Sequence, residues 1–180
     1  NKILKYNPTK VSRDSSEQIA VKVKNLEQLE SALQCNVGIV YYEDVNTLDE
    51  ALKMGIKFNK KISYSAPRII RHKEYKQLEK AKQTGLNSVQ VGSWGALDYF
   101  KDKELNIDYY LNAFNSETIN HFKEAGATNL CLSQELNIYE IKETLKYTDM
   151  QTECIVYGYT PLMITEYCPM GVIVKDWKKD

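Results

Sequence analysis

The stretch Val37-Gly38-Ile39-Val40-Tyr41-Tyr42 is a short run of β-branched and aromatic residues, the composition of a buried β-strand. Six similar runs accompany it: Ala20–Val23, Lys61–Tyr64, Ser88–Val91, Asp108–Leu111, Asn129–Leu132 and Glu153–Tyr157. The seven runs begin at residues 20, 37, 61, 88, 108, 129 and 153, so the steps are 17 to 27 residues long. This spacing accommodates a strand, a helix and two loops, the repeating unit of a parallel sheet. We therefore predict an α/β fold with mainly parallel strands.

The segments between the runs carry the start and stop patterns of helices. Asn25 is a predicted N-cap, and Asn137 with Glu140 forms a capping-box pair. Three glycines each follow a helical pattern, where a left-handed residue ends a helix: Gly55, Gly85 and Gly126. The composition does not change along the repeats. We therefore expect one domain over residues 20–180, preceded by an N-terminal extension over residues 1–19.

Two architectures fit this repeat, a (β/α)₈ barrel and an open doubly wound sheet. The sequence contains neither G-x-G-x-x-G nor G-x-x-x-x-G-K, the usual nucleotide-binding turns of doubly wound sheets, and its even spacing is typical of a barrel. A full barrel takes about 200 to 250 residues and eight strands. We therefore predict a TIM-like barrel that is incomplete or irregularly closed, with Ile3–Tyr6 and Val172–Val174 as candidate closing segments.

Composition excludes several classes of protein. The 24 Lys and Arg residues balance 24 Asp and Glu residues, so the strong basic footprint of a protein that grips nucleic acid by itself is missing. No segment has the roughly 20 apolar residues of a spanning helix, which argues against a membrane protein. The chain begins with Asn1 and its first methionine is Met54, so we expect a fragment whose main partner is the remainder of its own polypeptide. Four widely spaced cysteines, without a C-x-x-C pair or an export signal, predict reduced thiols in a cytoplasmic protein.

Polar side chains follow the expected C-terminal ends of the strands, where parallel α/β folds place functional groups. Asn112 and Asn115 follow the fifth run, and their amides suit a polar ligand, although Asn115 also fits the N-cap of the next helix. Glu135 follows the sixth run, either as a general acid or base or as a carboxylate favoured by a helix N-terminus. Arg68 follows the third run as a candidate substrate contact.

The stretch from Glu153 to Gly171 is the least generic part of the sequence. It resembles the collagenase-like peptidase family, peptidase family U32, whose signature has the form E-x-F-V-H-G-A-x-C-x-x-x-S-G-x-C. The signature's glutamate falls on Glu153, its glycine on Gly158 and its second cysteine on Cys168. Three more stretches look like this family: Val91–Leu97, Leu111–Ser116 and Leu132–Leu136. The resemblance spans roughly residues 20–175 and implies a protease by family label.

The chain departs from that signature at two of its chemically important positions, its histidine and its first cysteine. Tyr157 stands at its histidine and Pro161 at its first cysteine. The Pro-Leu-Met variant looks like the two-barrel branch of the family, in which such a unit is a second barrel late in a long polypeptide. No nucleophile–base pair is recognisable, so the catalytic residues stay open, with Glu135, Glu153 and Cys168 as candidates. The resemblance implies a peptide substrate.

Two other functions remain open beside the protease. Some members of the family are implicated in oxygen-independent hydroxylation of RNA bases or of a quinone precursor, with an iron–sulfur cluster held by four cysteines. The resemblance thus also implies a barrel module acting on RNA or a small aromatic molecule, with Cys168 as one cluster ligand in the full-length protein. One thiolate cannot hold such a cluster, so we expect this chain alone to bind no metal. The third alternative is a non-catalytic substrate-docking domain.

Strand ends converge at one face of a barrel, so the candidate residues are expected to share a cavity. We expect its lining to contain Asn112, Glu135, Glu153 and Tyr157, with Arg68 and Cys168 at the rim.

Overall fold

The computed structural model describes residues 10, 17–161 and 163–164. Its strands are β1 (Ala20–Val23), β2 (Ile39–Tyr42), β3 (Lys61–Ser65), β4 (Ser88–Val91), β5 (Glu104–Ile107), β6 (Ala127–Cys131) and β7 (Gln151–Glu153). Its helices are α1 (Leu26–Leu33), α2 (Leu48–Lys57), α3 (His72–Gln83), α4 (Trp94–Tyr99), α5 (Ser116–Glu124) and α6 (Ile138–Thr144), with the 3₁₀ turns η1 (Tyr109–Leu111) and η2 (Leu145–Tyr147). Strands and helices alternate, as the spacing of the runs predicts.

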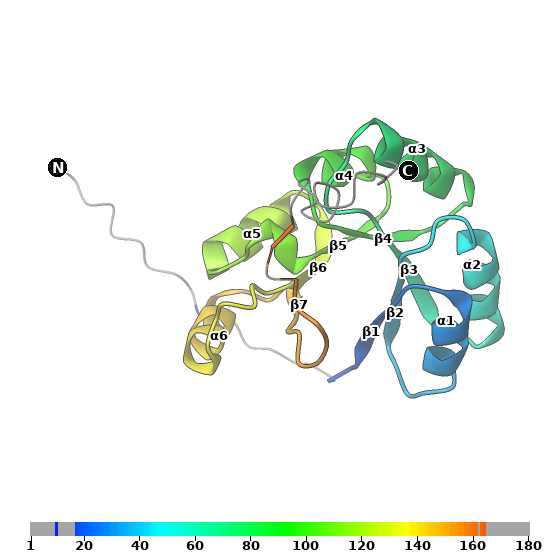
Figure 1. Ribbon diagram of the computed structural model, residues 1–180. Coiled ribbons are helices and arrows are strands. Elements are labelled where there is room, and N and C mark those ends of the chain that lie inside the picture. Colours follow the sequence, from blue (N-terminus) through cyan, green and yellow to red (C-terminus); the bar gives the residue numbers. More distant parts are fainter. Residues whose placement is uncertain (1–9, 11–16, 162, 165–180) are drawn as a thin grey trace, which may run out of the picture.

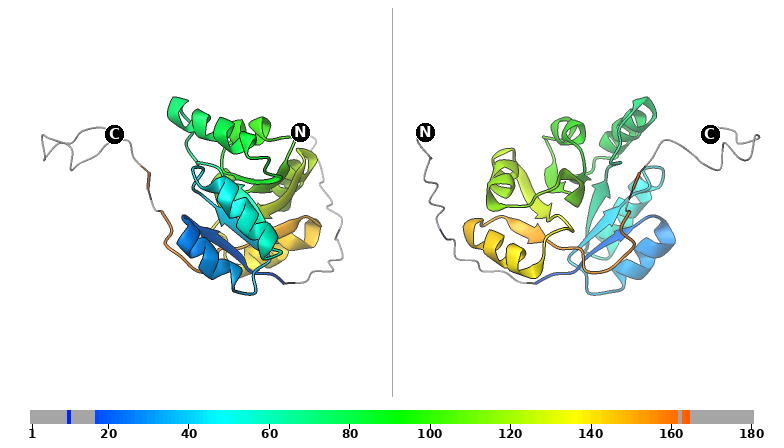
Figure 2. Two further views of the ribbon diagram at one scale, coloured as in Figure 1. Left: turned by 90° about the vertical axis from the view of Figure 1, so that its right-hand side faces the viewer. Right: turned by 60° about the vertical axis from the view of Figure 1, so that its left-hand side comes forward.

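The seven strands form one parallel sheet in the order β1 to β7 (Figure 1). The sheet bends into an arc, and the helices cover its outer, convex side (Figure 2). β1 and β7 are the two edges and do not pair with each other in the described part of the chain. The fold is therefore a TIM-like half-barrel, which confirms the predicted incomplete barrel. None of its described helices is both long enough and apolar enough to cross a membrane.

The two faces of the sheet differ in chemistry because side chains alternate along each strand. The strand register places four apolar residues side by side on the convex face: Tyr42, Tyr64, Val89 and Leu105. They are buried against helix residues that include Leu29, Leu48 and Phe122, and this layer is the hydrophobic core. On the concave face the register aligns four polar residues: Ser65, Gln90, Asn106 and Asn129. Only one face of the sheet is therefore built as an apolar interface.

Five strands end within two residues of the expected position, and two expected strand positions are wrong. The fifth strand is Glu104–Ile107, whereas we expected Asp108–Leu111. The Asp108 carboxylate accepts a hydrogen bond of 2.7 Å from the Tyr109 N–H and starts the 3₁₀ turn η1 there. The seventh strand ends at Glu153, not at Tyr157, because its partner β6 ends at Cys131 and pairs with it no further.

One predicted helix end is also wrong. Gly85 and Gly126 have φ angles of 73° and 92°, so they end helices as expected. Gly55 instead lies inside α2, and Asn59 takes the left-handed conformation two residues after the helix. A Cβ on Gly55 would lie 2.4 Å from Cγ1 of Ile62. Gly55 therefore lets α2 approach β3 closely.

We predict that Gly55→Ala lowers the free energy of unfolding by about 1–3 kcal/mol, because the new methyl group overlaps Ile62 and the backbone of Lys60. Gly95→Ala in α4 is the matched control, since a Cβ there meets nothing within 4 Å. That change should be neutral or stabilising by up to about 1 kcal/mol. Urea unfolding followed by circular dichroism measures both variants, and equal effects would contradict the close packing of α2 on β3.

Candidate functional site

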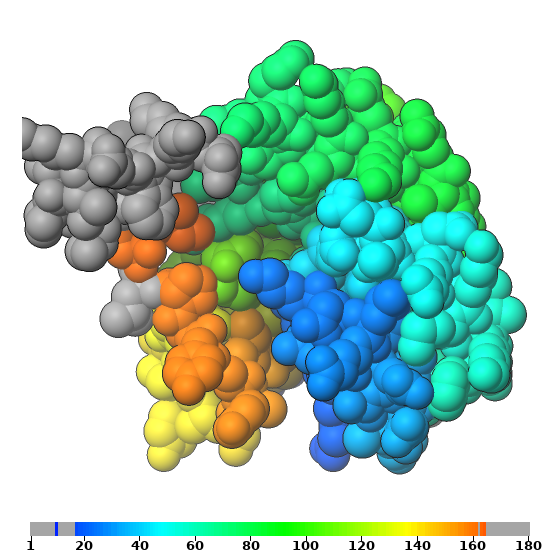
Figure 3. Space-filling model, turned by 45° about the vertical axis from the view of Figure 1, so that its right-hand side comes forward, coloured from blue at the N-terminus to red at the C-terminus, as the bar shows by residue number. Residues whose placement is uncertain are grey.

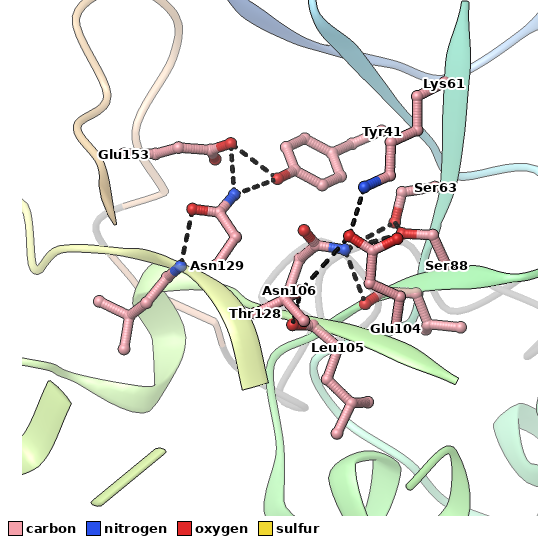
Figure 4. Close-up of polar contacts among 12 residues, drawn as sticks. Tyr41, Lys61, Ser63, Ser88, Glu104, Leu105, Asn106, Thr128, Asn129 and Glu153 are labelled. Atoms are coloured by element: carbon pink, nitrogen blue, oxygen red, sulfur yellow. Dashed lines mark hydrogen bonds and ion pairs between the residues drawn. The ribbon is translucent and has the colours of Figure 1, made fainter. Parts of the chain in front are cut away.

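The concave face of the central strands is a closed layer of hydrogen bonds (Figure 4). The Asn106 amide donates to the hydroxyls of Ser88 at 2.9 Å and Ser63 at 3.3 Å. The Ser65 hydroxyl donates to the Gln90 side-chain oxygen at 2.9 Å. These side chains are buried, and a buried polar group is stable only when it has such partners. We call this layer the polar floor; its side chains form most of their hydrogen bonds with one another.

A second polar cluster joins β2 to β6 and β7 across the concave face. The Tyr41 hydroxyl donates to Oε1 of Glu153 at 2.8 Å, and the Asn129 amide donates to the same oxygen at 2.6 Å (Figure 4). We call these three residues the Glu153 cluster. Burial raises the pKa of the Glu153 carboxyl despite both hydrogen bonds. Burial and the neighbouring Glu153 also raise the pKa of Tyr41, which therefore remains a neutral hydroxyl.

An ion pair makes another connection across this face. The Lys22 ammonium of β1 lies 2.9 Å from the Asp108 carboxylate, which follows β5 and whose side chain is only 5% exposed. Glu43 lies 3.9 Å from the same ammonium. Cys131 is buried nearby, and burial together with Asp108 and Glu153 raises the pKa of its thiol to about 12. Cys131 is therefore protonated at neutral pH and unsuited to act as a nucleophile.

A pocket of about 330 Å³ opens beside this ion pair, at the C-terminal ends of β1, β2 and β3. Its lining consists of Lys22, Lys24, Glu43, Ser65, Ala66, Pro67, Arg68 and Tyr110. The exposed Arg68 guanidinium lies 4.2 Å from the centre of the Tyr110 ring, a cation–π contact that favours this position. Among the described residues no carboxylate lies within ion-pair distance of Lys24 or Arg68. We call this cavity the cationic pocket.

The structure separates the residues for which we expected a common cavity. Glu153 belongs to the Glu153 cluster, and Arg68 lies in the cationic pocket. Asn112 is exposed after η1 with a φ angle of 51°, and Glu135 is exposed after β6. Tyr157 is 96% exposed. Cys168 lies outside the described residues.

Asn115 has the structural role that the sequence left open for it. Its side-chain oxygen accepts a hydrogen bond of 2.9 Å from the Thr118 N–H and caps α5. The residues that sequence reasoning missed are Lys22, Lys24, Tyr41, Asp108, Tyr110 and Asn129. A sequence pattern points to two of them, Lys22 and Asn129, because their strands alternate polar and apolar residues, as in Ala20-Val21-Lys22-Val23. Such alternation indicates a sheet with one polar face.

The described cysteines do not fit an iron–sulfur cluster. A cluster needs four thiolate ligands. Cys35 is exposed after α1, Cys131 is buried on the concave face, and Cys154 follows β7. In the described residues no three His, Cys, Asp or Glu side chains form a group that could hold a metal ion.

Comparisons with known proteins agree with this fold. The sequence model of peptidase family U32 matches residues 40–178, more than half of the chain. The U32 peptidase Mk0906 is similar in structure with a TM-score of 0.60 and 10% sequence identity, over 78% of this chain and 70% of that one. Thiamine phosphate pyrophosphorylase from Pyrococcus furiosus has a TM-score of 0.56 and 9% identity, over 76% of this chain and 73% of its own. No curated protein sequence gives a match.

The half-barrel with its polar concave face defines an α/β-barrel protein with a candidate ligand pocket at the C-terminal ends of its strands. The family match over residues 40–178 is more specific than the fold, because the two solved structures share only about a tenth of their residues with this chain. The chain belongs to peptidase family U32.

Glu153 gives a testable pH dependence of stability. Because its pKa is raised in the folded protein, the folded state holds a proton that the unfolded chain loses above about pH 4.3. The free energy of unfolding therefore falls as the pH rises from there to the raised folded-state pKa. Glu153→Gln removes this proton and keeps an oxygen that accepts both hydrogen bonds. We predict that the variant gains stability relative to the wild type as the pH rises through this window.

Urea unfolding of both proteins at several pH values between 4 and 8 measures this difference. Glu135→Gln is the matched control, because it makes the same change at an exposed carboxylate outside the cluster. A wild-type protein that gains stability over Glu153→Gln as the pH rises would contradict the burial of this carboxyl.

Proposed function

We propose that this chain is a substrate-binding half-barrel of family U32, which binds a small anionic molecule in the cationic pocket. The observation that carries the proposal is the pair Lys24 and Arg68, two cations in one pocket without a carboxylate partner among the described residues. Unpaired cations in a concave site attract anions and raise their local concentration. Of the functions left open by the sequence, this one corresponds to a substrate-docking domain.

The position and size of the pocket support the proposal. Barrel proteins bind their ligands at the C-terminal ends of the strands, where β1, β2 and β3 open into this pocket. Its volume of about 330 Å³ lies at the lower end of the range of small-molecule sites. The polar floor beside it is rigid, because Ser63, Ser88 and Asn106 bind one another. Because these side chains already have hydrogen-bond partners, they do not compete with the ligand for the cations of the pocket.

Peptide hydrolysis is the second candidate, and the properties of Glu153 favour it. A carboxyl whose pKa is raised by burial suits general acid–base catalysis near neutral pH. The family name gives the same indication. However, both hydrogen bonds of Glu153 go to Tyr41 and Asn129, and the cationic pocket has other lining residues. Casein cleavage that is lost in Glu153→Gln would favour this second candidate over the binding function.

Binding of a simple anion to the 180-residue chain tests the proposed function. We predict that titration with inorganic phosphate shifts the amide resonances of residues 22–24, 65, 66 and 68 in ¹H–¹⁵N correlation spectra. Arg68→Ala and Lys24→Ala should each raise the dissociation constant about tenfold, the effect of one charged hydrogen bond worth at least 1.4 kcal/mol.

Lys53→Ala is the matched control, because it removes the same charge from an exposed ion pair on α2 outside the pocket. It should change the dissociation constant by less than about twofold. Equal weakening by all three variants, or no resonance shift at the pocket, would contradict a specific anion site.

A further inference from the structure

We infer that the cationic pocket takes the phosphate group of a phosphate monoester, a dianion, in preference to singly charged anions. This inference rests on the proposed function and names the ligand chemistry of the same pocket. It follows from three features of the pocket. These are the contacts of its cations, the ion pairs that these cations already make, and the glycine that packs against Tyr110.

The turn after β5 positions two of the three cations. Asp108 caps η1 and holds the Lys22 ammonium at 2.9 Å. Tyr110, two residues later in the same turn, holds the Arg68 guanidinium at 4.2 Å from its ring centre. A guanidinium carries its N–H donors in one rigid plane, the arrangement that binds phosphate oxygens in pairs. One short turn therefore contacts both cations, through Asp108 and through Tyr110.

The charges of the pocket favour a dianion. The charge of Lys22 is balanced by Asp108 at 2.9 Å and Glu43 at 3.9 Å. Lys24 and Arg68 remain, and no described carboxylate lies within ion-pair distance of either. Three cations and two carboxylates leave the pocket with a net positive charge, and an incoming anion meets Lys24 and Arg68, the two cations without an ion-pair partner among the described residues. A group with two negative charges gains about twice the Coulomb energy there of a group with one. A phosphate monoester carries close to two above its second pKa of about 6, whereas a sulfate ester of the same shape carries one.

Gly92 at the end of β4 makes room for this arrangement. A Cβ at position 92 would lie 3.0 Å from Cδ2 of Tyr110, closer than side chains normally pack. A side chain at position 92 would therefore push the Tyr110 ring by a few tenths of an ångström. Tyr109 packs against the same ring, with 4.1 Å between ring centres. Gly92 thus acts through Tyr110 on the position of Arg68, as a positioning residue for the pocket.

The test uses methyl phosphate and methyl sulfate, which have nearly the same shape and differ in charge. Both are titrated into the ¹⁵N-labelled 180-residue chain at constant ionic strength, at pH 7.5 and pH 5.0. We expect methyl phosphate to bind at least about tenfold more tightly than methyl sulfate at pH 7.5. Its dissociation constant should rise about five- to tenfold at pH 5.0, where only about a tenth of the ester is dianionic. Lys22, Lys24, Arg68 and Glu43 line the pocket and Asp108 contacts Lys22, so the pH profile of methyl sulfate controls for titration of the protein.

Gly92→Ala tests the positioning of Arg68 without changing any charge. We expect it to weaken methyl phosphate binding about threefold, the effect of losing a cation–π contact. Gly95→Ala, three residues along the chain, is the matched control, because a Cβ there meets no neighbour within 4 Å. Unaltered binding by Gly92→Ala would overturn the positioning role of Gly92 and Tyr110.

The outcomes separate this inference from the proposed function. Equal affinity for the two esters, or a preference that does not change with pH, would overturn the phosphate assignment. Either result leaves an anion-binding pocket in place. Failure of every anion to shift the resonances of residues 22–24, 65, 66 and 68 would overturn both the inference and the proposed function.

Discussion

The ion pair between Lys22 and Asp108 joins the first strand of the sheet to the turn after the fifth, across the concave face. A complete barrel keeps its curvature because its last strand pairs with its first. In the described part of this chain β1 and β7 do not pair. Contacts across the concave face therefore hold the curvature of the sheet. The Glu153 cluster is the second such contact, between β2 and the last two strands. Figure 3 shows the hollow that remains between the blue N-terminal strand region and the orange segment near residue 155.

The inner face of the half-barrel is polar, whereas closed TIM barrels fill their interior with branched apolar side chains. The Ser, Asn and Gln side chains of this face are buried, and buried polar groups are stable only when they are hydrogen-bonded. Their bonds to one another meet that requirement. The same ion pair holds Lys22 at the edge of the cationic pocket, so the contact that keeps the sheet curved also shapes the site.

Much of the fold follows from the sequence because strand and helix periods repeat along the chain. The spacing of the apolar runs predicted seven parallel strands, and Asn25, Asn115 and Asn137 cap helices through their side chains. The site was harder to predict because its contacts join residues far apart in sequence: Lys22 with Asp108, and Tyr41 with Glu153. Nothing local to Lys22 indicates its partner. The turn at Asp108 was missed because Asp108-Tyr109-Tyr110-Leu111 has the aromatic composition of a strand. A single hydrogen bond from the Tyr109 N–H to the Asp108 carboxylate starts a 3₁₀ turn there instead.

A double-mutant cycle on Lys22 and Asp108 tests the central claim most directly. Lys22→Met and Asp108→Asn remove the two charges separately and together, and urea unfolding gives the free energy of each protein. Asp108 is almost completely buried and Lys22 is two-thirds covered, so the account predicts a coupling energy above about 1 kcal/mol, beyond the usual range of exposed pairs. A coupling energy near zero would contradict it, because the sheet would then keep its curvature and its pocket without this contact.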